Sequence, residues 1–354
     1  MAAGEVRGPR PVRDRDSARH RLPARPQDLA RRRRRVTQPL AASPTATALR
    51  ATTSPKPPDR FRTLIGVVAT TAPAALLLIV VVLFQQAWPS VTHFGLGFLA
   101  GSTWNPVTLQ FGAWPGIFGT VATSLMALVI ALPVGIAVAI VLAEQGQAGI
   151  RGAVGIAIEL LAAIPSVVYG IWALYVLGPW TFQHLESPVS DRFNSVGWLS
   201  SASPRSLFTA SLVLAVMILP TLTAVSRDVI RAVPRGLKEN AIALGSTWWE
   251  TTWRVILPSA RAGIFGATIL ALGRALGETI AVTMVIGNNY QIPQSIFSPA
   301  YTLASVIANE FTEATGDLYP AALVELGLAL ILVTLSANVI ALVLVRSATA
   351  RAAI

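Results

Sequence analysis

Two charged residues, Arg274 and Glu278, lie within an apolar run that extends from residue 269 to residue 287. A charged side chain at bilayer depth costs at least about 2.5 kcal/mol on insertion scales, so such residues normally face a protein interior or a water-filled path. A guanidinium group presents a planar fork of donors that fits two oxygens of an anion. Glu278 lies one helical turn after Arg274 on the same face, where it can hold the arginine in place. The spacing predicts an anion path through the membrane.

The same charges also fit a structural role, and this alternative stays open. A neutral pair, or a bridge from Arg274 to Glu159 in a neighbouring span, would lock a helix bundle. Gly273 and Gly277 form a G-x-x-x-G spacing beside the charges, which allows close approach of another helix. Counted from Gly263, Arg274 lies eleven residues along a helix, about 16 Å, which predicts a position near the middle of the bilayer.

The composition predicts an all-α membrane protein. Of the 354 residues, 53% are hydrophobic and 13% are charged, whereas about 25% of residues in ordinary soluble domains are charged. The charge-free stretch between Arg62 and Glu144 is long enough for two spans. Because cysteine is absent and the three histidines are scattered, no disulfide and no metal site is expected.

The apolar segments predict six transmembrane helices, with a loop over residues 178–205. Prolines 133, 165 and 220 are expected to kink their spans, and Glu325 in the sixth span is a lesser candidate for a gate. The spans are expected at residues 64–84, 117–143, 153–177, 207–224, 263–286 and 319–345.

Basic residues predict the orientation of these spans. With both termini in the cytoplasm, the inner segments hold 25 of the 28 lysines and arginines. Residues 1–62 alone carry 16 basic and 5 acidic residues and have the composition of a disordered cytoplasmic tail. A nucleic-acid-binding role for this tail is the alternative that such a basic run also permits. We expect a multi-pass protein of a prokaryotic cell membrane, surrounded by lipid and without a nucleic-acid partner.

The longest inner loop, residues 226–262, is expected to contain two short helices. The first ends at Gly245, and the second carries three tryptophans and stops at Pro258. Trp249 and Trp253, four residues apart, fall on one face. An apolar face on a cytoplasmic loop predicts a docking partner, although packing on the protein's own bundle is an alternative.

The sequence contains no phosphate-binding loop for nucleotides. The two lysines, Lys56 and Lys238, follow Pro and Leu, so the pattern G-x-x-x-x-G-K-[ST] is absent. If ATP drives this protein, another chain binds and hydrolyses it. We therefore expect neither a cofactor nor an enzymatic activity in this chain.

The inner loop resembles a family signature. Glu239, Ala241 and Gly245, followed by Leu257 and Pro258, have the spacing E-A-A-x3-G-x9-I-x-L-P of permease subunits of ATP-binding-cassette importers. Asn240 and Val255 depart from that pattern, but the acidic start, the glycine and the proline are retained. In that family, this loop sits in a cleft of the ATPase subunit.

Three further segments narrow the resemblance to the C-type permease subunit of phosphate importers, the PstC type. They are FLAGSTWNPVTLQFGAWPGIFGT, IELLAAIPSVVYGIWALYVL and LGRALGETIAVTMVIGN. The resemblance implies a type I (MetI-like) permease domain over residues 63–350. It also implies phosphate as substrate, with a similar second permease subunit, two ATP-binding subunits and an external phosphate-binding protein as partners.

Two other transport functions remain as alternatives. An importer of another oxyanion, such as molybdate or sulfate, would use the same coupling loop. A proton-coupled secondary carrier, in which Glu278 titrates, would need no ATPase.

Overall fold

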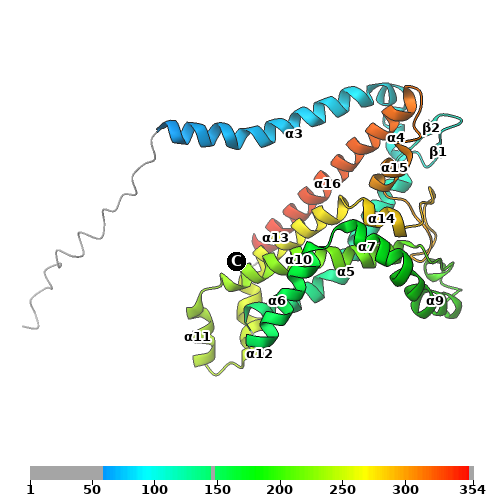
Figure 1. The fold of residues 1–354 in the computed structure, drawn as a ribbon. Helices are drawn as coiled ribbons and strands as arrows, with labels where there is room; N and C mark the ends of the chain where they lie inside the picture. The colour runs from blue at the N-terminus through cyan, green and yellow to red at the C-terminus, as the bar shows by residue number, and fades with distance from the viewer. Residues whose placement is uncertain (1–58, 145–147, 351–354) are drawn as a thin grey trace, which may run out of the picture. The chain divides into compact units, whose positions relative to one another are not determined.

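The computed structural model describes residues 59–144 and 148–350, which are mostly α-helical (Figure 1). The chain divides into two units, Met1–Thr70 and Thr71–Ile354. Residues 1–58 of the predicted basic tail lie outside the described residues. The longer helices are α3 (Asp59–Phe94), α5 (Trp114–Ala143), α6 (Ala148–Ala163), α10 (Leu207–Arg231), α13 (Leu257–Leu276) and α16 (Leu318–Ala350).

Short elements connect or extend these helices. Among them is a two-stranded antiparallel hairpin, in which Trp104 pairs with Phe111. The short elements are α4 (Gly97–Ala100), β1 (Trp104–Asn105), β2 (Gln110–Phe111), α7 (Ser166–Trp172), α8 (Gly178–Thr181), α9 (Ser187–Arg192), α11 (Arg235–Ala243), α12 (Trp248–Thr251), α14 (Ile280–Val285) and α15 (Leu303–Glu310).

Five helical segments of the described chain are long and apolar enough to cross a membrane. A bent pair of helices makes a sixth if it is counted as one span. The polytopic, all-α architecture predicted from the apolar pattern is therefore confirmed. The five segments are Thr63–Phe94, Trp114–Ala143, Leu207–Arg231, Trp248–Leu276 and Leu318–Val343.

The third predicted span is broken at Pro165. Its two parts, Gly149–Ala163 and Ser166–Arg192, meet at an angle of 96°. Pro165 has an extended backbone with ψ 144° and directly precedes α7. A proline disfavours helical geometry in the residue before it, so Ile164 is a natural place for the break. Pro133 and Pro220, by contrast, lie inside continuous helices.

The loop predicted over residues 178–205 is wrong for its first half, because helical structure continues to Arg192. Polar residues in this segment suggested a loop. Buried contacts explain the helix instead: Glu186 is fully buried and accepts hydrogen bonds from Ser206 Oγ at 3.1 Å and Thr209 Oγ1 at 2.7 Å. These bonds tie the segment to the start of α10.

Three π-helical turns stand just before prolines in this structure. In each turn the residue preceding the proline bonds to the carbonyl five residues back, as Leu257 does to Thr252. Proline lacks an N–H and its ring crowds the preceding turn of an α-helix, so a wider turn gives it room. The pairs are η1 (Ala173–Leu177) with Pro179, η2 (Phe182–Glu186) with Pro188, and η4 (Thr252–Ile256) with Pro258.

Pro258 therefore does not end the second helix of the inner loop, and the prediction that it does was wrong. Helix α12, the turn η4 and α13 run on without interruption from Trp248 to Leu276. The helix that begins in the inner loop is the same one that becomes the fifth span.

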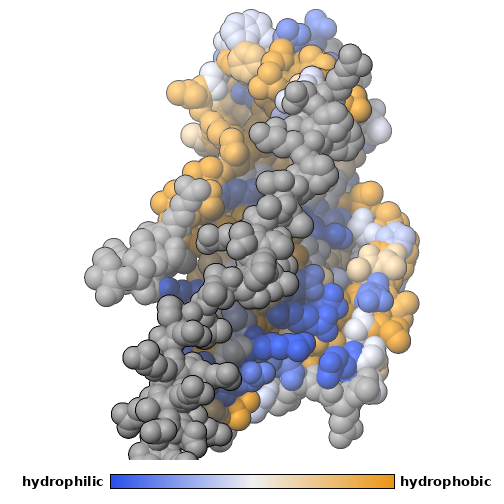
Figure 2. Space-filling view, turned by 90° about the vertical axis from the view of Figure 1, so that its left-hand side faces the viewer, coloured by the Kyte–Doolittle hydropathy of each residue, from blue (hydrophilic) through white to orange (hydrophobic). Residues whose placement is uncertain are grey.

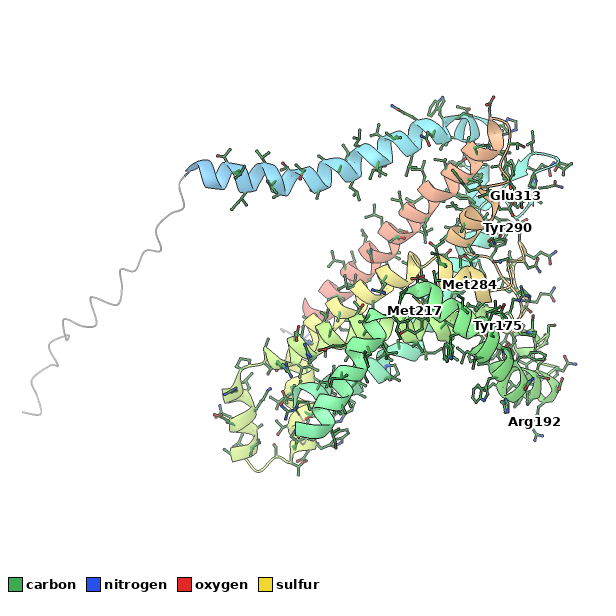
Figure 3. The ribbon with its side chains drawn as sticks, viewed as in Figure 1. Tyr175, Arg192, Met217, Met284, Tyr290 and Glu313 are labelled. Carbon is green, nitrogen blue, oxygen red and sulfur yellow. The ribbon has the colours of Figure 1, made fainter. Side chains whose placement is uncertain are left out.

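Helix α10 forms the centre of the bundle and packs against α5 and α13. Small residues let these helices approach closely. A Cβ atom on Gly135 of α5 would lie 2.7 Å from Leu222 of α10, and one on Gly170 of α7 would lie 2.6 Å from the Met284 sulfur. Met217 and Met284 mark this core in Figure 3. Helix α13, which packs on α10, carries Arg274.

Candidate functional site

The turn between α11 and α12 depends on Gly245. This residue has a φ of +89°, a conformation that favours glycine. The Gly245 N–H donates to the Ile242 carbonyl at 2.9 Å, and the Ser246 N–H donates to the Ala241 carbonyl at 3.1 Å. This is the Schellman pattern that ends helices. The predicted glycine turn is confirmed, and Ala241 is buried beneath it.

A capping box fixes the start of α12. Thr247 Oγ1 accepts a bond from the Glu250 N–H at 3.3 Å, and the Glu250 carboxylate accepts one from the Thr247 N–H at 2.9 Å. Two otherwise unpaired N–H groups at the helix start are thereby satisfied. The loop thus has a defined shape on both sides of Gly245.

Two basic residues tie this loop to the end of α5. The ammonium group of Lys238 forms an ion pair with the Glu144 carboxylate, and both side chains are mostly buried. Arg231 Nη2 donates to the Leu142 carbonyl at 2.9 Å. The sequence analysis missed these contacts because each joins residues about 90 positions apart. The sequence held one sign of a role for Glu144: it is the first charged residue after Arg62 and directly follows an apolar span.

The loop exposes apolar side chains around the Gly245 turn. Leu244 is 88% exposed, and Ile242 and Leu237 are also largely open to solvent. Hydrophilic residues gather on the lower part of the face shown in Figure 2, where α11 lies. Glu239 is exposed on α11, Pro258 is exposed and Leu257 is half-buried. An apolar knob within a polar surface is a feature expected of a docking site.

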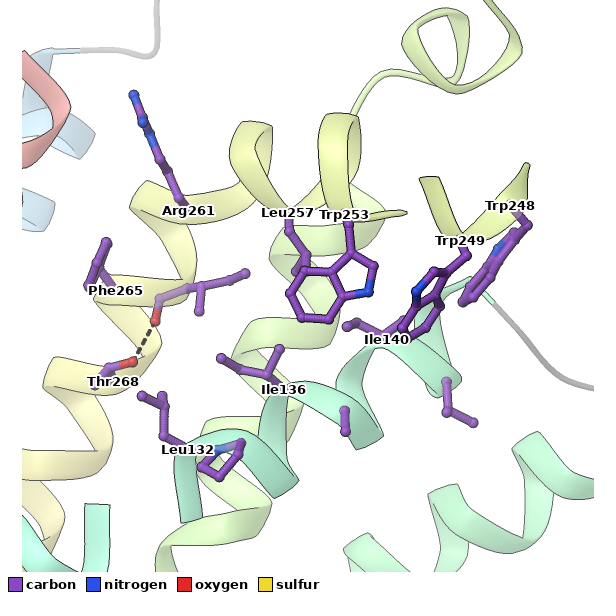
Figure 4. Close-up of a pocket in the computed structure, with 14 residues that line it drawn as sticks. Leu132, Ile136, Ile140, Trp248, Trp249, Trp253, Leu257, Arg261, Phe265 and Thr268 are labelled. Carbon is purple, nitrogen blue, oxygen red and sulfur yellow. Dashed lines mark hydrogen bonds between the residues drawn. The ribbon is translucent and has the colours of Figure 1, made fainter. Parts of the chain in front are cut away.

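The tryptophans of the loop lie elsewhere. Trp249 and Trp253 share one face, as predicted, with ring centroids 5.6 Å apart. They line a cavity together with residues of α5 and α13 (Figure 4), and Leu244 does not line this cavity. Trp248 packs partly buried against Ile256 and its neighbours. Part of this helix thus packs on the protein's own bundle, as the alternative interpretation held.

Arg274 lies in the last turn of α13, and its side chain is exposed. The helix ends at Leu276, and Gly277 caps it before α14 begins at Ile280. Glu278 therefore follows the end of α13 and does not continue its face. No ion pair joins Arg274 to Glu278 within the described chain, so the expected paired geometry is wrong.

A cavity of about 510 Å³ opens beside Arg274. It is lined by three polar side chains from three helices: Thr221 of α10, Arg274 of α13 and Asn338 of α16. Asn338 Oδ1 is buried and forms no hydrogen bond with a described residue. The cavity offers one fixed positive charge and two neutral hydrogen-bonding groups, a combination that suits an anion.

The other acidic candidates do not line this cavity. Glu159 is exposed on α6 and forms no ion pair with Arg274, and Glu278 is half-buried beyond the helix end. The Tyr169 hydroxyl of α7 donates to the Leu161 carbonyl at 2.8 Å. Of the three residues predicted for the path, the structure places only Arg274 on the cavity.

Glu325 lies in a different place, on α16 toward α3. It is 8% exposed and borders a cavity of about 310 Å³ whose other walls are largely apolar, including Val91 and Leu332. Its Oε2 atom forms no hydrogen bond with a described residue. This position does not connect Glu325 with Arg274.

A second polar centre, which the sequence analysis missed, lies around Glu310 of α15. Its carboxylate accepts hydrogen bonds from Trp104 Nε1 at 3.3 Å and from the Tyr319 hydroxyl. Phe111 and Tyr319 stack with centroids 5.2 Å apart. Trp104 also packs against Phe111, with ring centroids 4.7 Å apart. Glu313 follows α15 at the same end as Tyr290 (Figure 3).

Two tyrosines of this cluster are held neutral. Burial raises the pKa of the Tyr290 hydroxyl, and the nearby Glu310 carboxylate raises it further. The hydroxyl donates to the Gly112 carbonyl, which fixes the segment before α5. Burial also raises the pKa of Tyr301, whose hydroxyl accepts a bond from Asn309 Nδ2 at 2.7 Å. The cluster is a rigid support for the segments that join the spans.

Comparison with known families decides what kind of protein this is. Residues 131–351, more than half of the chain, match the family of binding-protein-dependent transport system inner membrane components. The chain belongs to this family. As a member, it is a multi-pass membrane permease of an ATP-binding-cassette importer, and that prediction is confirmed.

Several relatives of this importer permease are named phosphate transport system permease protein PstC. The chain is 47% identical to the phosphate transport system permease protein PstC of Mesorhizobium japonicum, over 75% of this chain and 85% of the relative. It is 49% identical to PstC of Pasteurella multocida, over 70% of this chain and 79% of the relative. It is 37% identical to PstC 1 of Mycobacterium tuberculosis, over 74% of this chain and 85% of the relative.

A solved structure supports the permease fold. A chain of a bacterial alginate ABC transporter in complex with an alginate pentasaccharide-bound periplasmic protein has a TM-score of 0.50 and 17% identity. The similarity covers 79% of this chain and 96% of that one. The fold resemblance therefore extends over nearly the whole of the solved chain.

Proposed function

We propose that this permease carries inorganic phosphate across the cytoplasmic membrane, driven by ATP hydrolysis on separate ATPase subunits. The observation that supports this substrate is the 47% and 49% identity to relatives named phosphate transport permeases, over most of their length. The site is consistent in charge, because Arg274 gives its cavity a fixed positive group.

Arg274 is proposed to contact the anion in the path. A guanidinium donates two parallel hydrogen bonds to an oxyanion. Thr221 and Asn338 face the same cavity and supply further donors. Glu278 and Glu159 are proposed to act nearby, on neighbouring segments of the path, without pairing directly with Arg274. The single guanidinium of Arg274 neutralises only part of the charge of a phosphate ion, so the bound anion can still be released.

The loop around Gly245 is proposed to dock on an ATPase subunit. Leu237, Ile242 and Leu244 form the exposed apolar surface, and Glu239 is exposed close to them on α11. Movement of the ATPase reaches the membrane bundle by two routes. The first is the Lys238 ion pair to the end of α5, and the second is the continuous helix that leads to Arg274.

The assembly is proposed to contain a similar second permease subunit, two ATP-binding subunits and an external phosphate-binding protein. Both termini then lie in the cytoplasm, in agreement with the distribution of basic residues. ATP binds to the partner subunits, so this chain needs no cofactor and catalyses no reaction. Closure of the ATPases rocks the two permease bundles between inward-open and outward-open states.

Uptake of radiolabelled phosphate into cells that lack their own phosphate importers tests this proposal. Cells that express the chain with its partner subunits are expected to accumulate phosphate, and excess molybdate or sulfate should compete weakly. Uptake that ignores excess phosphate would assign the chain to another oxyanion. Uptake that survives inactivation of the ATPase subunits would instead indicate a secondary carrier.

A further inference from the structure

A buried acidic side chain lies inside the last candidate membrane span. Glu325 lies seven residues after Leu318 on α16, about 10 Å along the helix. It falls within the segment Leu318–Val343, which is long and apolar enough to cross a membrane. The side chain is 8% exposed, and its Oε2 atom is buried without a hydrogen bond to any residue that the structure describes. An ionisable group at this depth is costly and calls for an explanation.

The carboxyl borders a cavity of about 310 Å³ whose other lining residues are apolar. Residues between 91 and 99, at the end of α3 and in α4, form one side, and residues between 325 and 332 of α16 form the other. The volume lies at the lower end of the range found for pockets that bind small molecules. Leu96 and Leu332 in its walls are 87% and 54% exposed, so the cavity is open at its rim. A small apolar molecule can therefore reach Glu325.

The walls of this cavity supply no cation. Glu325 is the only ionisable residue among the described residues that line it. His93 of α3 is exposed and does not line the cavity, and Arg274 of α13 lines a different one. The sequence has no lysine or arginine from residue 63 to 150 or from residue 275 to 345, the segments that hold both walls. Burial without a cation disfavours the charged form of a carboxyl, so Glu325 keeps its proton.

We infer that Glu325 is held as a neutral carboxylic acid and that its cavity binds small apolar molecules with a hydrogen-bond acceptor, among them carbodiimides, which then modify the acid. In this reaction the carboxyl proton moves to one carbodiimide nitrogen, the carboxyl oxygen bonds to the central carbon, and one C=N bond becomes single. The product is an O-acylisourea. Where water and amines are excluded, the acyl group moves to the nitrogen and leaves a stable N-acylurea. The apolar walls favour this product, and the inference does not depend on the transported substrate.

Labelling with dicyclohexylcarbodiimide, an apolar reagent, tests this site. The full-length chain is reconstituted in vesicles, treated at neutral pH and digested, and mass spectrometry locates the adducts. An ordinary glutamate has a pKa of about 4.3, so only about one in 500 is protonated at neutral pH. We therefore expect Glu325 to be modified about 100-fold faster than Glu313, which is exposed after α15. A water-soluble carbodiimide that carries a charge should spare Glu325, because the apolar cavity excludes it.

Two leucines of α16 provide matched variants. Leu332 lines the cavity, whereas Leu335, which is similarly exposed, lies about one turn farther along the helix and does not line it. Leu332→Trp should lower the rate at which Glu325 is modified by about fivefold or more, because the reagent must displace the added ring. Leu335→Trp should leave this rate unchanged.

Three results would overturn the inference. The first is modification of Glu325 no faster than that of Glu313, which would mean that the carboxyl is ionised or out of reach. The second is equally fast modification of Glu325 by both reagents, which would make the cavity a water-filled one. The third is an equal effect of Leu332→Trp and Leu335→Trp, which would show that the reagent does not reach the acid through this cavity.

Discussion

Replacement of Gly245 by alanine should loosen the coupling loop by a predictable amount. The φ of +89° places this residue where an L side chain costs about 1 to 2 kcal/mol. Beyond its own chain neighbours, no atom lies within 4 Å of the position that a Cβ would take, so the cost comes from the backbone conformation. An energy of this size changes an equilibrium by about 5- to 30-fold.

Two measurements report this change. Hydrogen exchange of the Ser246 amide, which donates to Ala241, should accelerate by about 5- to 30-fold. The affinity of the ATPase subunits for vesicles that contain the permease should fall by a similar factor, because they must then order the turn. Gly245→Asn should have a smaller effect, since asparagine tolerates positive φ better than alanine does.

Gly236→Ala is the matched control in the same loop. Gly236 lies in the first turn of α11, also with no atom within 4 Å of the Cβ position, and its φ is not positive. Alanine should favour the helix there by up to about 1 kcal/mol. The reasoning is refuted if Gly245→Ala exchanges and binds like the wild type, or if both substitutions have the same effect.

Three further perturbations follow from the contacts described above. Lys238→Ala and Glu144→Gln should each lower the thermal stability of the purified protein. A double-mutant cycle should give a coupling energy of about 1 to 3 kcal/mol, a value between those of exposed and of buried ion pairs. Additive effects of the two substitutions would show that the ion pair contributes nothing. Arg274→Gln should abolish phosphate uptake while the subunits still assemble. Arg192→Gln, on the exposed end of α9, should leave uptake unchanged. If Arg274→Gln instead prevents assembly, the residue locks the bundle. The pKa of Tyr290 is raised by folding, so the associated stability is complete below the unfolded value near 10 and is lost as the pH rises above it. Tyr290→Phe should therefore flatten the alkaline part of the pH profile of unfolding, and an unchanged profile would contradict this assignment.

The apolar pattern was sufficient for five of the six predicted spans, and Gly245 was sufficient for the loop turn, because both follow from local chemistry. Helix α5 is mostly apolar and contains no charged residue, and Gly245 marks a helix end that few other residues permit. The fold of these parts is encoded within a few neighbouring residues. Sequence reasoning is strongest where the cause of a structure is this local.

Other parts depend on contacts between distant residues, and the sequence did not reveal them. The segment to Arg192 looked like a loop until Ser206 and Thr209 were seen to bind the buried Glu186. Pro258 looked like a helix stop, but a π-helical turn accommodates it. Only part of the cavity site was predicted. Arg274 was found by its charge, whereas Thr221 and Asn338 reach the same cavity only because their helices pack beside α13.

Because the helix from Trp248 to Leu276 is uninterrupted, a small tilt at the loop moves the end that carries Arg274 by a larger distance. Its 29 residues span about 43 Å, so a tilt of about 5° at the loop displaces the far end by nearly 4 Å. That is more than the length of a hydrogen bond. A small rotation of an attached subunit is thus enough to move Arg274 into or out of reach of an ion, without any refolding of the chain between them.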